Sequence, residues 1–112
     1  ARHRLTRRSD FRAVTRRGAR GAAGCLVVHL LVTDGSLPAR AGLVVSKSVG
    51  GSVVRHRVSR RLRGALTPVM AELPDGACLV IRALPNAATT DAQSLGDDIR
   101  RGVDLALSKV QR

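Results

Sequence analysis

The chain has 112 residues, 44% of them hydrophobic, which fits one domain built around one core. Twenty Lys and Arg residues stand against eight Asp and Glu, giving a formal net charge of +12. So large an excess argues against a cationic partner and favours a polyanion, with nucleic acid first and an anionic membrane surface second. The longest apolar run, residues 25–32, is much too short to span a bilayer, so we expect no membrane span.

Cysteine, histidine and carboxylate positions argue against a catalytic or metal site within the chain. Cys25 and Cys78 are too few and too far apart for a disulfide framework or a zinc site, so we expect buried free thiols. With no signal-peptide pattern, this predicts a cytoplasmic protein. Most carboxylates occupy capping or turn positions or the polar side of the last helix, and no pair of them is typical of a general acid and base. We therefore expect no catalytic residue and no metal ligand, and any activity should come from a partner.

The first expected element is a short helix over residues 10–17. Thr6 or Ser9 can cap it, and Gly18 follows as its stop. Phe11 is the single aromatic residue of the chain, and we expect it to fix this helix to a sheet.

Three apolar segments predict strands. Residues 21–24 break the pattern, and residues 25–32 then form a strand that is apolar on both faces, with His29 as the exception. Residues 33–40 form a turn, and residues 41–46 form a second strand, expected to pair with the first as a hairpin. Residues 77–83 are uninterrupted in their apolar character, which predicts a central strand.

The most informative stretch is residues 47–73. It turns at Gly50 and Gly51 and enters a helix, capped by Gly51 or Ser52, that Pro68 should kink or divide. An apolar stripe recurs at three- and four-residue spacing, at Val54, Val58, Leu62, Ala65, Leu66, Val69 and Leu73. Four arginines lie outside the stripe, and no Asp or Glu occurs from residue 47 to residue 69. A solvated face normally mixes charge signs, so this helix face indicates anion binding.

Arg55 differs from the other arginines of this helix, because its angle places it inside the apolar arc. A buried guanidinium needs a partner, and a cation near a helix N-terminus opposes the helix dipole. Arg55 is therefore placed for a reason other than stability, or its side chain bends out around the sheet edge.

A last helix follows a loop at residues 85–90, with Thr90 or Asp91 as its cap. The resulting order is α-β-β-α-β-α, an α/β fold that forms one RNA-binding domain over residues 1–112. Two alternatives remain: a general or ribosome-associated RNA-binding protein without a processing role, and a DNA-binding module whose basic helix enters a major groove. For the second, the sequence offers no helix-turn-helix pair.

Residues 40–63 resemble the signature of the bacterial ribonuclease P protein component. The family pattern is a strand ending in Ser-Lys, then Val-Gly, then a helix beginning Arg-Asn-Arg and continuing with Lys-Arg and further Arg. Ser46-Lys47, Val49-Gly50, Arg55-His56-Arg57 and Ser59-Arg60 occupy these places here. Ser9-Asp10-Phe11 with Gly18 and residues 80–83 resemble further segments of the family, so the likeness covers nearly the whole chain.

The resemblance implies an α+β two-layer sandwich like that of some ribosomal proteins, with an unusual left-handed crossover through the Arg-rich helix. It implies a non-catalytic subunit of an endoribonuclease. Its partners would be the ribonuclease P RNA, which carries the chemistry and binds Mg²⁺, and precursor tRNA, which is cleaved to give the mature 5′ end. It implies no membrane and no dedicated protein partner.

The resemblance also assigns two sets of site residues. Those expected to contact the catalytic RNA are Lys47, Arg55, His56, Arg57, Arg60, Arg61 and Arg63. Those expected to line a cleft for the 5′ leader of the precursor are Phe11, Arg12, Thr15, Arg16, Val27 and His29. His56 replaces the usual Asn, Ser59 replaces a common Lys, and Thr15, Leu26 and His29 stand where many relatives have aromatic residues. Leader contacts should therefore depend more on arginine and shape than on stacking.

Overall fold

The computed structural model describes residues 5, 7–33, 35 and 37–110. The elements in chain order are α1 (Arg8–Arg17), β1 (Ala19–Ala23), β2 (Leu26–Val32), β3 (Arg40–Val44), α2 (Ser52–Met70), β4 (Ala77–Ala83), the 3₁₀ helix η1 (Pro85–Ala88) and α3 (Ala92–Val110). The expected α-β-β-α-β-α order is confirmed, with β1 as an additional strand before the first expected one.

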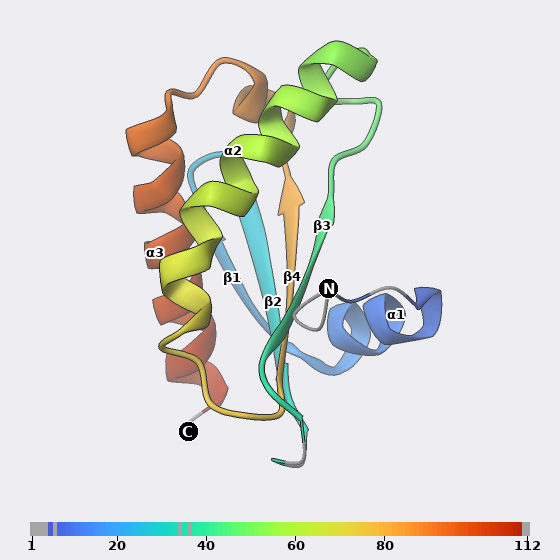
Figure 1. Ribbon diagram of the computed structural model, residues 1–112, viewed down its shortest axis with the longest axis vertical. Coiled ribbons are helices and arrows are strands. Elements are labelled where there is room, and N and C mark those ends of the chain that lie inside the picture. Colours follow the sequence, from blue (N-terminus) through green and yellow to red (C-terminus); the bar gives the residue numbers. More distant parts are fainter. Residues whose placement is uncertain (1–4, 6, 34, 36, 111–112) are drawn as a thin grey trace.

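The strands form a single sheet in the order β1-β2-β4-β3 (Figure 1). β2 is antiparallel to both β1 and β4, whereas β3 runs parallel to β4. The expected hairpin between the segments at 25–32 and 41–46 is wrong, because β4 lies between them. An interior position suits the uninterrupted apolar sequence of β4, whose expected central place is confirmed.

The β1 strand overlaps residues 21–24, where the hydrophobic pattern predicts a break. It consists of Ala, Arg and Gly, and it pairs along its whole length with β2. Small residues are needed here because α3 lies close above the strand: a Cβ on Gly21 would come within 2.4 Å of the Gly102 carbonyl oxygen. Close helix packing therefore determines this composition, and no apolar alternation signals the strand.

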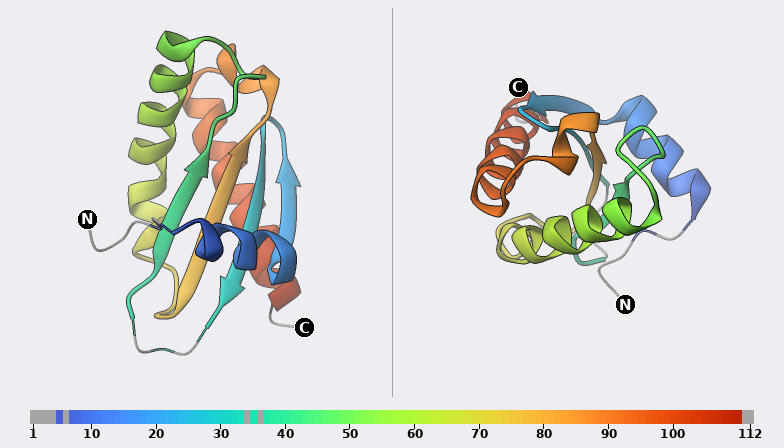
Figure 2. Two further views of the ribbon diagram at one scale, coloured as in Figure 1. Left: turned by 90° about the vertical axis from the view of Figure 1, so that its right-hand side faces the viewer. Right: turned by 90° about the horizontal axis from the view of Figure 1, so that it is seen from above.

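Helices α2 and α3 cover one face of the sheet, and α1 crosses the other (Figure 2). Seen from the α2 side with β3 and β4 running upward, β4 lies to the left of β3 (Figure 1). The crossover through α2 is therefore left-handed, as expected, whereas nearly all parallel crossovers are right-handed.

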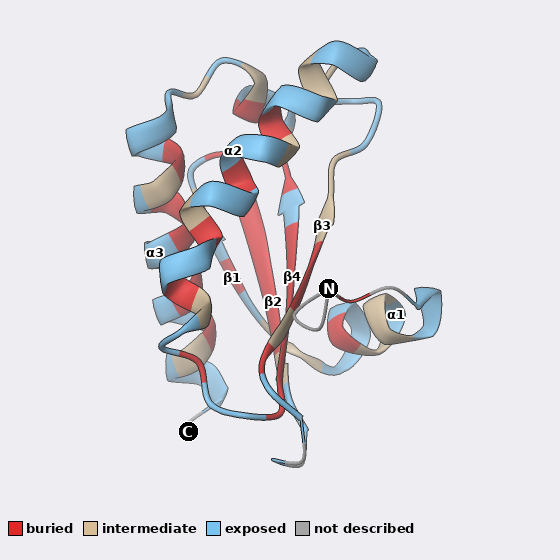
Figure 3. Cartoon of the chain, viewed as in Figure 1, coloured by how far each residue is buried: buried red, intermediate tan, exposed pale blue. Residues whose placement is uncertain are grey.

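Two clusters of buried residues hold these layers together. Buried residues lie along the sheet and on the sides of the helices that face it (Figure 3). The larger cluster fills the space between the sheet and the helices α2 and α3, and the smaller, under α1, contains Leu5, Val14, Cys78 and Val80. Both cysteines are buried free thiols, as expected. The first five residues of β2 are buried, which confirms a strand covered on both sides.

The helix ends agree with the sequence only in part. Gly51 is the N-cap of α2, and the helix runs unbroken through Pro68 to Met70, so the expected division is wrong. Pro68 lies in the last turn, where losing one backbone hydrogen bond leaves the preceding ladder intact. Gly18 follows the end of α1 as expected. At the start of α1 the N-cap is Arg7, whereas Ser9, one of the two expected caps, lies within the first turn. Thr6, the other expected cap, and Asp34 of the expected turn lie outside the described residues.

The α3 helix confirms one expectation and corrects another. The Asp91 carboxylate accepts a hydrogen bond from the Ser94 N–H at 2.8 Å, which confirms Asp91 as a cap. Asp98, expected on the polar side of this helix, is 6% exposed, because it turns inward to the β1–β2 turn. Within the part of the chain that the structure describes, no helix is long and apolar enough to cross a membrane.

Candidate nucleic-acid interface

The solvent side of α2 is rich in arginine. The apolar stripe of the helix, with Val58, Leu62, Leu66 and Val69 buried, faces the sheet and α3. The helical period of 100° per residue turns the four arginines to the opposite side, where they are exposed: Arg57, Arg60, Arg61 and Arg63. Ion pairs between described residues join Arg100 to Glu72 and Arg101 to Asp98, and neither involves α2.

Three of these arginines, Arg57, Arg60 and Arg61, line a shallow hollow of about 260 Å³. Arg57 Nη2 donates to the Ala88 carbonyl oxygen at 3.0 Å, and Arg61 Nη1 donates to the Thr90 carbonyl oxygen at 3.4 Å. These bonds use few of the five donors that each guanidinium carries. The side chains are therefore oriented while most of their N–H groups remain available to an anion.

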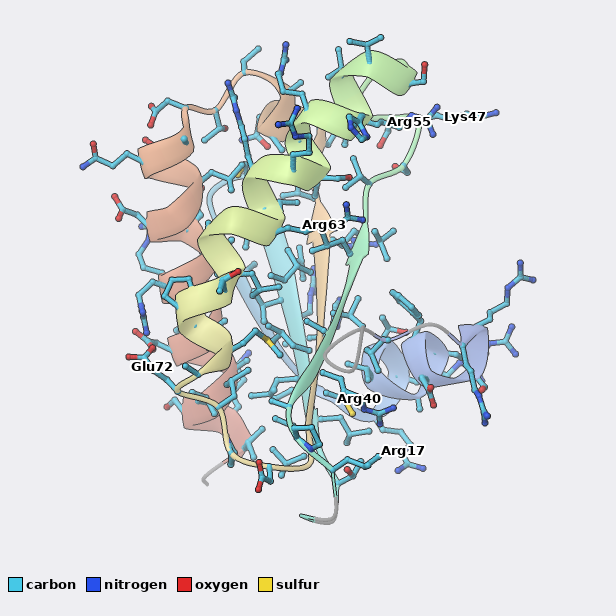
Figure 4. The ribbon with its side chains drawn as sticks, viewed as in Figure 1. Arg17, Arg40, Lys47, Arg55, Arg63 and Glu72 are labelled. Carbon is cyan, nitrogen blue, oxygen red and sulfur yellow. The ribbon has the colours of Figure 1, made fainter. Side chains whose placement is uncertain are left out.

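The loop before α2 carries Lys47 at the same end of the molecule as Arg55 (Figure 4). It is held by two backbone turns, Val49 N–H to Ser46 O at 3.1 Å and Gly50 N–H to Lys47 O at 3.2 Å. Lys47 is exposed, and so is His56 in the first turns of the helix. The structure thus gathers all seven residues expected to contact the catalytic RNA on this loop and along α2.

Arg55 is half-buried, as its angle on the helix predicts. Its Nε atom is buried and has no hydrogen-bond partner among the described residues. Because an unpaired buried donor destabilises the fold, this geometry agrees with a side chain placed for binding.

The residues expected to line the leader cleft lie on α1 and on the sheet face beside it. Phe11 packs over Gly42, where a Cβ would come within 2.3 Å of the ring Cζ, so Phe11 fixes α1 to β3 as expected. Thr15 Oγ1 donates to the Phe11 carbonyl oxygen at 3.0 Å, so its hydroxyl is engaged within its own helix. Arg12 and Arg16 are exposed.

Val27 and His29 project from β2 toward the α1 side of the sheet. Leu26, Val28 and Leu30 belong to the core under α2 and α3, and alternate residues of a strand face opposite ways. Burial lowers the pKa of His29, and the nearby cations Arg82 and Arg20 lower it further. His29 is therefore neutral at neutral pH.

Arg20 and Arg82 belong to this face although sequence reasoning did not select them. Arg20 lies directly opposite His29 on β1, and Arg82 lies opposite Val27 on β4. Alternation along β4 could have placed Arg82 on this face. No sequence signal could have placed Arg20 on this face, because the hydrophobic pattern does not reveal the strand β1.

Fold and surface together define a small α/β RNA-binding module. A family model described as Ribonuclease P matches residues 1–106. The ribonuclease P protein component of Mycobacterium sp. (strain KMS) is 45% identical over 112 residues, covering 99% of this chain and 95% of that protein. The corresponding protein of Nocardioides sp. strain JS614 is 48% identical over 103 residues, covering 90% and 88%. The chain therefore belongs to the family of ribonuclease P protein components, the protein subunits of that endoribonuclease, and an RNA-binding role without processing is not favoured.

Solved structures show the same fold. The RNase P protein of Staphylococcus aureus superposes with a TM-score of 0.81 at 19% identity, covering 93% of this chain and 94% of that chain. The RNase P protein of Thermotoga maritima superposes with a TM-score of 0.76 at 21% identity, covering 94% and 96%. The architecture is thus retained although the sequences have diverged widely.

Proposed function

We propose that this chain binds the catalytic RNA subunit of ribonuclease P through α2 and its preceding loop. In the same proposal, the α1 side of the sheet binds the 5′ leader of precursor tRNA, and the protein assists Mg²⁺-dependent endonucleolytic removal of that leader. The observation that carries the proposal is the basic face of α2, whose arginines contact no carboxylate of a described residue. An arginine fork matches phosphate oxygens in two hydrogen bonds, so such a surface suits a folded RNA.

The described carboxylates with resolved contacts serve the fold. Asp91 caps α3, Asp98 holds the β1–β2 turn, and Glu72 pairs with Arg100. The described residues include no group of three His, Cys, Asp or Glu that could hold a metal ion. In this proposal the RNA subunit holds the Mg²⁺ ion and carries the chemistry.

The two surfaces have separate tasks. Contacts to phosphates fix the position and orientation of a partner without reading its sequence, which suits the anchoring of one large RNA on α2. The sheet face meets a single strand, for which stacking on aromatic side chains is the common device. Since Phe11 is engaged with Gly42, cationic side chains should contribute most of the leader contacts here.

Reconstitution with the RNA subunit tests the proposal. The purified protein alone should cleave nothing, and its addition to the RNA at low Mg²⁺ should accelerate cleavage of precursor tRNA. The affinity of the reconstituted complex should be higher for precursor tRNA than for mature tRNA. An absence of stimulation would contradict the proposal, and stimulation without any difference between precursor and mature tRNA would restrict it to the α2 surface.

A further inference from the structure

The connection between β4 and α3 carries the two backbone carbonyl groups to which the arginines of α2 donate. Arg57 Nη2 donates to the Ala88 carbonyl oxygen at 3.0 Å, and Arg61 Nη1 donates to the Thr90 carbonyl oxygen at 3.4 Å. Both acceptors lie in residues 85–90, which comprise η1 and the two residues after it. We call residues 85–90 the η1 segment. Two arginines of α2 therefore share one support that lies 29 to 31 residues further along the chain.

The η1 segment is fixed to the core at its start. The Leu84 N–H, immediately before the segment, donates to the Cys25 carbonyl oxygen at 2.8 Å, and Ala87 within the segment is buried. Cys25 is itself held by α3, because its N–H donates to the Asp98 carboxylate at 3.0 Å. The start of the η1 segment is thus tied to the β1–β2 turn and, through that turn, to α3.

The end of the η1 segment is closed on the Asn86 carbonyl oxygen. This oxygen accepts the Thr90 hydroxyl at 2.8 Å, the Thr89 hydroxyl at 3.3 Å and the Thr89 N–H at 3.2 Å. The bond from the Thr90 hydroxyl is the shortest, and it spans the turn that carries both carbonyl groups facing α2. Hydroxyl side chains commonly fix a turn by bonding to nearby backbone groups. Removing the Thr90 hydroxyl should therefore loosen this turn and leave both acceptors in place chemically.

The direction in which an arginine side chain is held affects its affinity for an anion. An exposed arginine occupies many rotamers, and ordering it during binding weakens the association. A hydrogen bond to a fixed carbonyl group orders the guanidinium before a partner arrives, and the remaining N–H groups stay free to donate. The bonds to the η1 segment therefore favour anion binding by Arg57 and Arg61.

We propose that Thr90 is a positioning residue for RNA binding at α2. Its hydroxyl fixes the η1 segment, and the carbonyl groups of that segment hold Arg57 and Arg61 in the orientation that meets RNA phosphates. The inference rests on the proposed function, since it takes the basic side of α2 as the surface that binds the RNA subunit. Thr90 needs no contact with the RNA, because it acts through the two guanidinium groups.

Substitutions at Thr90 test the role of its hydroxyl. Thr90→Val keeps the size of the side chain and should weaken binding to the RNA subunit by roughly two- to fivefold, the effect of having to order one arginine side chain during binding. Thr90→Ala, which also lacks the hydroxyl, should behave like Thr90→Val, and Thr90→Ser should bind as the unmodified protein does. Filter binding measures these affinities, and circular dichroism confirms that each variant is folded.

The matched control is Thr67→Val on α2. The Thr67 hydroxyl also donates to a backbone carbonyl oxygen four residues earlier, that of Arg63, at 3.1 Å. This bond lies within one helix and supports no arginine side chain, so Thr67→Val should leave the affinity unchanged. If Thr90→Val binds no more weakly than Thr67→Val, the inference is overturned.

A second comparison asks whether Thr90 acts through the arginines. In the variant Arg57→Ala/Arg61→Ala, adding Thr90→Val should not weaken binding further, because the groups that it positions are absent. The same loss in both backgrounds would mean that Thr90 only stabilises the fold, and would overturn the inference. If Arg57→Ala/Arg61→Ala binds as tightly as the unmodified protein, or the unmodified protein does not bind the RNA subunit, the proposed function fails instead.

Discussion

At the scale of single residues, Asp98 shows how one buried carboxylate joins two distant parts of the chain. Its Oδ2 accepts the Cys25 N–H at 3.0 Å, and its Oδ1 accepts Arg101 Nη2 at 2.5 Å. Gly24, with a φ of +55°, brings the turn so close that a Cβ there would lie 2.1 Å from Oδ2. Asp98 therefore holds the β1–β2 turn against α3.

Replacing Asp98 should destabilise the protein measurably. Asp98→Ala leaves the buried Cys25 N–H without a partner, so we expect a loss of about 1–3 kcal/mol in the free energy of unfolding. Urea denaturation monitored by circular dichroism measures this loss. The control is Asp97→Ala, since Asp97 is exposed and adjacent. Equal stabilities of the two variants would mean that the Asp98 contact is dispensable.

The same contact predicts a pH dependence. Burial acts to raise the pKa of Asp98, but hydrogen bonds from Cys25 and Arg101 outweigh burial and lower it below 3.8. The folded state therefore binds this proton less readily than the unfolded state does. The stabilisation by Asp98 is complete above pH 3.8 and is lost as the pH falls through the lower pKa that Asp98 has in the folded state. The difference in unfolding free energy between the native protein and Asp98→Ala should thus shrink only in that acidic range. A difference that shrinks already near neutral pH would contradict this assignment.

At the scale of elements, the two sides of α2 have different roles: one side stabilises the fold, and the other side is available to bind RNA. One side carries the apolar stripe that packs on the core. The other side carries arginines, two of which donate hydrogen bonds to backbone carbonyl oxygens outside the helix. A change on the outer side should therefore affect RNA binding more than it affects folding.

The variants Arg57→Ala and Arg61→Ala test this separation. Each should weaken binding to the RNA subunit by about fivefold, equivalent to about 1 kcal/mol, and lower the unfolding free energy by less than about 1 kcal/mol. Filter binding and urea denaturation measure the two effects. Arg100→Ala is the control, because it removes the same charge beside Glu72, at the opposite end of α2 from Lys47 (Figure 4). A large loss of stability in Arg57→Ala or Arg61→Ala would mean that these arginines are structural.

At the scale of the whole molecule, the net charge of +12 should govern association with RNA. If about five cations displace counterions, log affinity for the RNA subunit should fall with log salt concentration at a slope of roughly −3 to −5. Binding measured over a series of KCl concentrations gives this slope. A flat response would exclude the basic face of α2 as the contact surface.

What the sequence by itself determined is local. Neighbouring residues specify hydrophobic periodicity and helix caps. The two-sided character of α2, the cap at Asp91 and the apolar sequences of β2 and β4 could therefore be predicted from single stretches of the chain. The family signature lies in the stretch that leads into α2 and forms its first turns, so the RNA-binding class could be predicted from those residues alone. The roles of the site residues themselves remain predictions.

Tertiary structure decided everything that joins distant segments. The β1 strand of small residues, the position of β4 between β2 and β3, and the inward turn of Asp98 depend on what packs against them. Arg20, His29 and Arg82 share one face of the sheet for the same reason, because only the register of three strands aligns them. Strand register is set by pairing and burial across the whole core, and those are contacts that no local pattern contains.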